Sequence, residues 1–246
     1  GMPILILLRH GQSQWNLENR FTGWVDVDLT ETGEAQARKG GELIAAEGLE
    51  IDEAFTSVQT RAIRTNNLAL DAAGQSWVPV TKAWRLNERH YGGLTGLDKT
   101  ETVAKHGEDQ VKIWRRSYDV PPPPLAAGSE YDLSGDRRYR SVQVPATESL
   151  KTTLERVLPY WSEAIAPRLS EGKNVLISAH GNSLRAIVKH LFDVSEDDIV
   201  NVEIPTGNPL MVVLDDHLRP VSAKYLDEER AQGLPRHQRR GSRGSP

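Results

Sequence analysis

The sequence predicts an α/β protein with a mostly parallel central sheet and helices on both faces. Two short, continuously apolar segments, at residues 4–8 and 175–179, are typical of central strands that are buried on both sides. Strand and helix patterns alternate around them, an order that favours right-handed crossovers onto one sheet. A chain of 246 residues with 38% apolar and 26% charged residues has the composition of a globular protein.

Two strand–helix units are predicted in the N-terminal part. The first strand ends abruptly at the polar residues 9–11. After a polar loop, Thr30 is suited to cap a helix that Gly48 ends in the left-handed conformation. Residues 54–57 then form a second short strand, which leads into a helix that ends near Gly74. These units predict the first half of a parallel sheet.

Residues 85–145 interrupt this alternation and are predicted to be a long lid insertion. Apolar periodicity nearly vanishes, apart from a helix that a capping box at residues 98–101 opens and Gly107 stops. The four prolines at 121–124 favour a stiff, extended strap on the surface. Loops of this length in compact domains are usually lids or disordered segments, and we expect a lid here.

The C-terminal part predicts one long helix and two more strands. Apolar residues at helical spacing follow Thr147, and we expect Pro159 to kink that helix. The buried strand at 175–179 ends at His180 and precedes a further amphipathic helix. Residues 210–214 form the last predicted strand. The sheet would therefore receive strands from both ends of the chain.

Composition excludes several classes of chemistry and partner. Without cysteine the chain has no disulfides, thiolate metal sites or cysteine nucleophiles. No apolar run approaches the ~20 residues of a membrane helix and no signal-peptide pattern is present, so we expect a cytoplasmic protein. The chain has a formal net charge of −4, but residues 230–246 hold five arginines and no acid. The other residues therefore sum to −9, and a body this acidic disfavours binding to nucleic acid.

The same charge distribution separates a tail from the predicted domain. We assign residues 2–227 to a single α/β domain and residues 228–246 to an arginine- and glycine-rich tail. We expect this tail to pack across the mouth of the crevice described below or against a neighbouring molecule. Truncation after Asp227 tests the first version, which predicts a change in the rates of the reactions catalysed in that crevice.

One strand ending occurs twice and is the most informative motif. His10-Gly11-Gln12-Ser13 and His180-Gly181-Asn182-Ser183 each follow a buried strand, and the two histidines are 170 residues apart. Ligands of open α/β sheets bind outside the carboxyl ends of strands, so both rings are expected to face one crevice. Single histidines are more often structural, an interpretation kept for His90, His106, His190, His217 and His237.

Arginines are predicted around this crevice. Arg9 ends a buried strand, where an unpaired charge is expensive, and Arg61 lies in the first turn after the second strand. A histidine among arginines suggests that His10 attacks phosphorus directly. Arg9, Arg61 and His180 would then form an electrostatic clamp. Glu88 is the candidate that protonates the departing oxygen, with an arginine-paired surface glutamate as its alternative.

Other catalytic motifs are absent from the sequence. No His-Glu-Xaa-Xaa-His spacing indicates a metal site, and the residues beside the two histidines are arginine, serine and asparagine. The first histidine motif lacks the second glycine of a serine-hydrolase elbow, and no Walker loop for nucleotides is found. Metal-independent phosphoryl transfer is therefore the chemistry that the residues favour.

Further short motifs extend the two histidine repeats. They are Arg-His-Gly-Gln-Ser-Gln-Trp-Asn at 9–16, Phe-Thr-Gly-Trp at 21–24, Asn-Glu-Arg-His-Tyr-Gly at 87–92, Leu-Thr-Gly-Leu-Asp-Lys at 94–99, Trp-Arg-Arg at 114–116 and Ala-His-Gly-Asn-Ser-Leu-Arg at 179–185. Together with Arg61 they make the chain resemble the cofactor-dependent phosphoglycerate mutases of the histidine phosphatase superfamily, over residues 3–227. The Arg-His-Gly element is common to the superfamily, whereas the segment 91–99 and the paired arginines at 115–116 are more specific to mutases.

The resemblance implies an enzyme of glycolysis and gluconeogenesis that interconverts 3-phosphoglycerate and 2-phosphoglycerate. The cofactor 2,3-bisphosphoglycerate would prime His10 with a phosphoryl group, without a metal. His180 would stabilise the transferring group, and Glu88 would shuttle the proton. The residues implied to contact substrate are Arg9, Ser13, Asn16, Thr22, Gly23, Arg61, Arg89, Tyr91, Lys99, Arg115, Arg116, Gly181 and Asn182.

Two alternatives stay open at this point. One is a phosphatase of the same superfamily that acts on bisphosphoglycerate or another phosphomonoester, and the other is a catalytically silent anion-binding protein. A mutase must keep its phosphohistidine from water, a task that the insertion at 85–145 would perform. The resemblance also implies a homodimer or homotetramer whose partners are small phosphorylated three-carbon acids, and neither nucleic acid nor a membrane.

Overall fold

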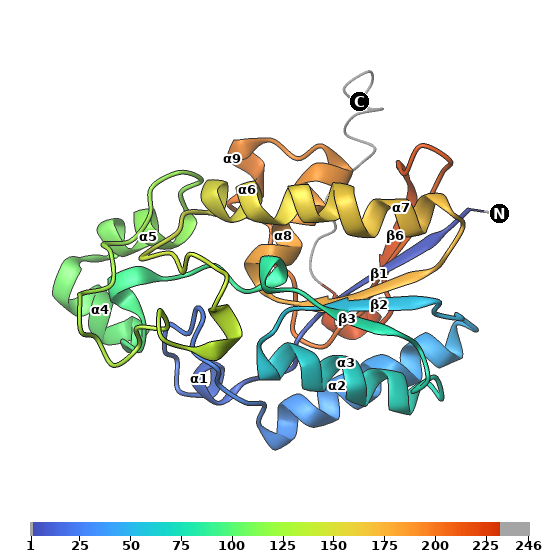
Figure 1. Cartoon of the computed structure of the whole chain (residues 1–246), viewed down its shortest axis with the longest axis horizontal. Helices are drawn as coiled ribbons and strands as arrows, with labels where there is room; N and C mark the ends of the chain where they lie inside the picture. The colour runs from blue at the N-terminus through green and yellow to red at the C-terminus, as the bar shows by residue number, and fades with distance from the viewer. Residues whose placement is uncertain (1, 232–246) are drawn as a thin grey trace.

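Six strands form one sheet in the computed structural model, which describes residues 2–231 (Figure 1). The strands are β1 (Ile4–Arg9), β2 (Glu53–Thr56), β3 (Val80–Lys82), β4 (Val175–Ala179), β5 (Leu210–Leu214) and β6 (Pro220–Tyr225). Their order across the sheet is β3-β2-β4-β1-β5-β6. The pairs among the first four are parallel, whereas β5 runs antiparallel to β1 and to β6. The predicted mostly parallel sheet is confirmed.

Helices cover both faces of this sheet, as predicted (Figure 1). Because side chains alternate along β1, Ile6 and Leu8 face one layer, whereas Leu5 and Leu7 face the other. The first layer holds α2 (Glu31–Ala46) and α3 (Thr60–Ala72), and the second holds α6 (Leu150–Tyr160), α7 (Ala166–Ser170) and α8 (Gly181–Phe192). All four β1 side chains are completely buried, so β1 is the centre of the core.

The predicted ends of the first two helices are close to the observed ones. The Thr30 side chain accepts a hydrogen bond from the Gly33 amide at 3.1 Å and so caps α2. Gly48 and Gly74 follow α2 and α3 with positive φ angles of 71° and 73°. Local sequence signals were sufficient to predict these helix ends, because N-caps and C-terminal glycines act on residues within one helical turn.

The long helix predicted from Thr147 is interrupted. It begins at Leu150, with Ser149 as its N-cap, and its hydrogen-bonding pattern becomes π-helical over Trp161–Ile165. Pro159 and Pro167 lie on either side of that turn, and neither has an amide hydrogen for the regular α-helical pattern. The expected disturbance near Pro159 thus takes the form of a π-helical turn.

The segment 85–145 is more regular than predicted. The expected helix is α4 (Lys99–His106), but a second helix, α5 (Glu108–Arg116), follows it directly. The proline strap lies against Gly93, whose amide donates to the Pro123 carbonyl at 2.6 Å. Figure 1 shows this segment beyond the carboxyl ends of the parallel strands, where a site is expected. Its role as a lid stays a prediction.

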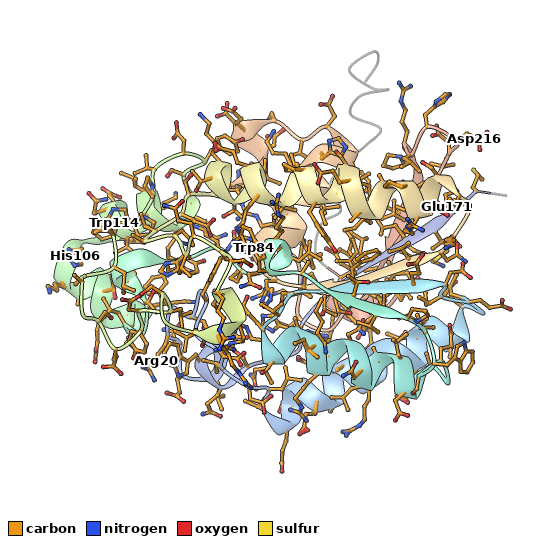
Figure 2. The ribbon with its side chains drawn as sticks, viewed as in Figure 1. Arg20, Trp84, His106, Trp114, Glu171 and Asp216 are labelled. Carbon is orange, nitrogen blue, oxygen red and sulfur yellow. The ribbon has the colours of Figure 1, made fainter. Side chains whose placement is uncertain are left out.

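The remaining described elements are short. They are α1 (Gln14–Leu17), α9 (Glu196–Ile199) and the 3-10 turns Trp84–Leu86, Gly92–Leu94, Arg137–Tyr139 and Glu228–Arg230. Figure 2 places Arg20, His106 and Trp114 at one end of the molecule, and Glu171 and Asp216 at the opposite end. No helix within residues 2–231 is long and apolar enough to cross a membrane. The predicted tail begins at residue 228, and Arg230 within it donates to the Thr206 carbonyl at 2.8 Å. The rest of the tail, residues 232–246, lies outside the described part of the chain, so the packing expected of it stays a prediction.

Candidate active site

The two strand-end histidines lie side by side. Parallel pairing of β1 with β4 places Arg9 opposite Ala179, so the next residue of each strand is a histidine at the same level. The His10 amide donates to the Ala179 carbonyl at 3.0 Å. The ring centroids of His10 and His180 are 5.1 Å apart, with an angle of 62° between the planes. The predicted meeting of both rings is therefore observed.

The hydrogen bonds of His10 define which ring nitrogen is free. Nδ1 lies 2.7 Å from the Gly11 carbonyl oxygen, which can only accept, so Nδ1 carries the proton. Nε2 is then unprotonated and accepts a 3.3 Å hydrogen bond from Arg61 Nε. Burial, followed by the charges of Arg61 and Arg9, lowers the pKa of His10 well below its ordinary value. The ring is therefore neutral at pH 7, and the lone pair on its Nε2 could act as a nucleophile.

Arg61 is held rigidly beside that nucleophile. Its guanidinium donates to the carbonyls of Val25 and Gly23, at 2.9 and 2.8 Å. Burial lowers the pKa of Arg61 to about 10, which still leaves it cationic at neutral pH. Arg9 donates one bond to the Ile204 carbonyl at 2.9 Å, and its buried Nε has no hydrogen-bond partner among residues 2–231. Both cations can therefore neutralise an anion that approaches His10.

Ser57 orients the second histidine. His180 Nε2 lies 2.7 Å from Ser57 Oγ, which also accepts a 3.1 Å bond from the Gln59 amide. Within the described residues the hydroxyl hydrogen has one acceptor in reach, His180 Nε2, so Nδ1 of that ring carries the proton. Burial lowers the pKa of His180 well below its ordinary value. The buried Nδ1 has no hydrogen-bond partner in residues 2–231.

The Glu88 carboxylate is held by backbone amides and not by an arginine. Its Oε1 accepts from the amides of Arg89 and Asn182 at 2.8 and 3.0 Å, and its own amide donates to Gln59 Oε1 at 2.8 Å. The residue is 8% exposed and belongs to no ion pair in the described part of the chain. The alternative of an arginine-paired surface glutamate is wrong.

Two cavities that share several lining residues lie at this end of the sheet. A cavity of about 50 Å³ reaches His10 and Arg61, and one of about 190 Å³ reaches Arg115 and Arg116. Both are lined by Arg9, Glu88, Tyr91 and Lys99. No group of three or more metal-ligating side chains occurs within residues 2–231. The arrangement can bind a small ligand with two separated anionic groups, one of them beside the nucleophile.

A sequence model of the histidine phosphatase superfamily (branch 1) matches residues 5–222. The chain belongs to this superfamily. Curated relatives carry the name 2,3-bisphosphoglycerate-dependent phosphoglycerate mutase. The relative from Caulobacter sp. (strain K31) is 76% identical over 95% of this chain and 99% of its own length. The one from Zymomonas mobilis is 65% identical, over 92% of this chain and all of its own length.

Solved structures of other proteins share the fold at low sequence identity. A mycobacterial glucosyl-3-phosphoglycerate phosphatase, solved with VO3, matches with a TM-score of 0.70 and 20% identity, over 95% of this chain and 99% of its own. The Bacillus stearothermophilus protein YhfR matches with a TM-score of 0.68 and 21% identity, over 94% of this chain and 98% of its own. These likenesses support the histidine phosphatase fold alone.

This member of the histidine phosphatase superfamily brings most of the predicted site residues to the two cavities, whereas His180, Ser13 and Arg89 line neither of them. The predicted residues that line the cavities are Arg9, His10, Asn16, Thr22, Gly23, Arg61, Glu88, Tyr91, Lys99, Arg115, Arg116, Gly181 and Asn182. Ser13 lines neither cavity. Its hydroxyl instead accepts a hydrogen bond from the Asn16 amide at 3.2 Å and so caps α1. The Ser13 amide in turn donates to Asn16 Oδ1 at 3.0 Å and so orients that side chain.

Arg89 does not line either cavity of the superfamily fold. Its buried guanidinium donates to the carbonyls of Glu148, Trp114 and Arg115 at 2.9, 2.5 and 3.3 Å. All three acceptors are backbone oxygens, so the side chain holds the C-terminal end of α5 against the domain. Arg89 thereby positions Arg115 and Arg116, which do line the larger cavity.

Sequence reasoning missed several residues of this superfamily site. Arg185 lines the larger cavity and donates to Asn182 Oδ1 at 2.8 Å. It is the last residue of the motif at 179–185 and lies about one helical turn after Asn182, a spacing that could have indicated it. Arg20 lines the smaller cavity. Glu203 lines the larger one, but it comes from a loop without a motif. Ser57, at the end of β2, had no local signal either.

Proposed function

We propose that this chain is a phosphoglycerate mutase that interconverts 3-phosphoglycerate and 2-phosphoglycerate through a phosphohistidine at His10. The unprotonated Nε2 of His10 beside Arg61, at the end of a cavity with a second cationic region, is the observation that carries the proposal. Relatives that are 60–76% identical carry the mutase name, which supports the same choice. The substrates are small phosphorylated three-carbon acids of glycolysis and gluconeogenesis.

The cavities fit 2,3-bisphosphoglycerate, the cofactor in the name of those relatives. Its two phosphoryl groups and its carboxylate carry a large negative charge, and Arg9, Lys99, Arg115, Arg116 and Arg185 line the larger cavity. When bound, this compound supplies the phosphoryl group that primes His10. The residues that face the phosphoryl group at the ring would be Arg9, Arg61 and Asn16, which line the smaller cavity.

The proposed reaction balances protons through Glu88. When the phosphorylated enzyme holds 3-phosphoglycerate, ionised Glu88 accepts the proton of the 2-hydroxyl as that oxygen forms a bond to phosphorus. The bond from phosphorus to Nε2 breaks, and His10 becomes neutral again. His10 then attacks the 3-phosphoryl group, and protonated Glu88 returns its proton to the departing oxygen. The product is 2-phosphoglycerate on the phosphorylated enzyme.

Charge at the transferring group is balanced by fixed cations and one neutral donor. Arg61 donates to two carbonyls and Arg9 to one, so neither guanidinium needs to reorganise as the phosphoryl group moves. His180 would contribute the unpartnered Nδ1 hydrogen. We also propose that the segment 85–145 excludes water from the phosphohistidine.

The test is a mutase assay that requires the cofactor. The purified chain should convert 3-phosphoglycerate to 2-phosphoglycerate when 2,3-bisphosphoglycerate is present, with little release of inorganic phosphate. Labelled bisphosphoglycerate should leave acid-labile phosphate on the chain, and His10→Ala should abolish both signals. Phosphate release as the main outcome would indicate a phosphatase, and no labelling would indicate a silent anion-binding protein.

Assembly and location are part of the same proposal. We propose a cytoplasmic homodimer or homotetramer that binds neither nucleic acid nor membranes. Light scattering on the purified chain measures its mass in solution, and a monomeric mass would contradict the proposed assembly.

A further inference from the structure

The larger cavity contains a carboxylate that the proposed reaction does not use. Glu203 lines it together with Glu88, and Glu203 Oε1 lies 2.5 Å from Arg116 Nη2. Arg116 belongs to the cationic region that would hold the substrate group remote from His10. A negative charge in this place opposes the binding of any anion, so it needs a functional explanation.

The backbone around Glu203 is anchored to the catalytic end of β1. Its neighbour Ile204 is 2% exposed, and the Ile204 carbonyl accepts the 2.9 Å hydrogen bond from Arg9. On the other side, the Val202 amide donates to the Ile199 carbonyl at 3.1 Å. Glu203 is therefore presented to the cavity from a fixed loop, with Arg116 approaching from the end of α5.

The ion pair itself remains open to exchange. The side chains of Arg116 and Glu203 are 36% and 54% exposed, so water and ligands reach both partners. An exposed pair of this kind contributes little to stability, and a competing anion can replace the carboxylate at low cost. Hydrogen bonding from Arg116, with the charges of Arg9 and Arg185, lowers the pKa of Glu203, so the carboxylate is ionised at neutral pH.

Arg116 is distinguished from the other cations of the same cavity. Among the described residues, Arg9, Lys99, Arg115 and Arg185 form no ion pair, whereas Arg116 does. Arg185 donates to neutral oxygens of Asn182 and Ile199 instead. Of these five cations, only Arg116 has its charge paired with an anion among the described residues.

We propose that Glu203 is a specificity-determining residue that occupies Arg116 until the remote anionic group of the substrate replaces it. This inference rests on the proposed function, because it takes that group to be the carboxylate or second phosphoryl group of a phosphorylated three-carbon acid. Glu203 weakens the binding of every anion at Arg116. It therefore selects ligands whose second anionic group is strong enough to displace it, and it speeds their release.

Substitution by glutamine tests the charge while it preserves the shape. Glu203→Gln should bind 2,3-bisphosphoglycerate about three- to tenfold more tightly, as expected for removal of one like charge at an exposed cationic site. The dissociation constant is measured by titration calorimetry in the His10→Ala background, which prevents phosphoryl transfer. Glu203→Asp keeps the charge and should bind within about twofold of the parent protein, as expected for a charge effect.

Glu171→Gln is the matched control. Glu171 also forms an exposed pair with an arginine, Arg168, at 3.1 Å, and it lies at the opposite end of the molecule from Trp114 of α5 (Figure 2), so its substitution makes the same change in net charge away from the cavity. Its affinity should stay within about twofold of the parent protein, because exposed charges at a distance are screened by salt. Equal or weaker binding by Glu203→Gln would overturn the inference alone. If no variant binds bisphosphoglycerate, both the inference and the proposed function fail.

Discussion

Arg156 offers the sharpest test of how the domain positions Glu88. Its guanidinium donates to both carboxylate oxygens of Glu148, at 2.8 and 2.9 Å. Its remaining hydrogens go to the carbonyls of Arg85, Asn87 and Glu88, at 3.0, 2.8 and 2.7 Å. All five donors are therefore used, and both side chains of the ion pair are less than a tenth exposed. This single side chain from α6 fixes the segment that carries the proposed proton shuttle.

Arg156→Met should destabilise the fold and slow the reaction. The substitution leaves the Glu148 carboxylate buried without its partner, which costs about 3–5 kcal/mol. For a chain of this size, 1 kcal/mol lowers Tm by about 2–4 °C, so the expected decrease is roughly 6–20 °C. Glu88 would also lose the bond that holds its carbonyl, and a displacement of about 1 Å costs on the order of 100-fold in rate. Scanning calorimetry and single-turnover phosphorylation of His10 measure the two effects.

A second substitution separates the unpaired charge from the lost packing. Arg156→Met combined with Glu148→Gln removes the buried charge and keeps an oxygen that can accept from the His90 amide, which now donates to Glu148 at 2.9 Å. The double variant should be about 1–3 kcal/mol more stable than Arg156→Met alone. A Tm within about 3 °C of the parent protein for Arg156→Met, or a double variant no more stable than the single one, would refute this reasoning.

Two further outcomes follow from the buried histidines. Ser57→Ala removes the hydroxyl that orients His180. The loss of this hydrogen bond, about 1–3 kcal/mol, should lower kcat about 10- to 100-fold while the circular dichroism spectrum stays unchanged. An unaltered kcat would contradict the proposed tautomer of His180. Burial lowers the pKa of His90 to about 4, so between pH 6.5 and 4 the unfolded chain binds more protons than the folded one. The free energy of unfolding should therefore decrease with falling pH by about 1.4 kcal/mol per unit from this ring, and His90→Asn should show a shallower decrease in urea titrations; equal slopes refute the assignment.

The sequence was sufficient for the elements with strong local signals. β1 and β4 are continuously apolar, and Thr30 and Gly48 delimit α2 by hydrogen bonding and backbone conformation within one turn. β3 and β6 were missed because they lie at the edges of the sheet and have mostly partly buried or exposed residues, which carry no clear apolar pattern. α5 was missed because it begins directly after the glycine that ends α4. Edge strands such as β3 and β6 acquire their structure from tertiary contacts that no window of sequence contains.

The site residues divide in the same way, into those that a local motif predicts and those whose contacts are distant in the sequence. His10 and His180 could be paired because each follows a strand in a repeated motif. Arg89 was assigned to substrate because its charge was visible, whereas its three carbonyl acceptors lie 25 to 59 residues further along the chain. Ser57 contacts a ring 123 residues away, and nothing in its neighbourhood indicates that contact. Residue type indicates what a side chain can bind, and only the fold determines what it does bind.

The glycine after His10 acts through close packing and not through an unusual turn. The φ angle of Gly11 is not positive, so its backbone conformation does not require glycine. A Cβ at this position would, however, lie 2.2 Å from the Gly33 carbonyl oxygen. A Cβ on Gly33 would likewise lie 2.0 Å from the Gln12 carbonyl oxygen, so the two backbones approach without side chains between them. This contact fixes the loop whose Gly11 carbonyl receives the Nδ1 hydrogen of His10. The tautomer that leaves Nε2 free for phosphorus thus depends on backbone packing between the end of β1 and the start of α2.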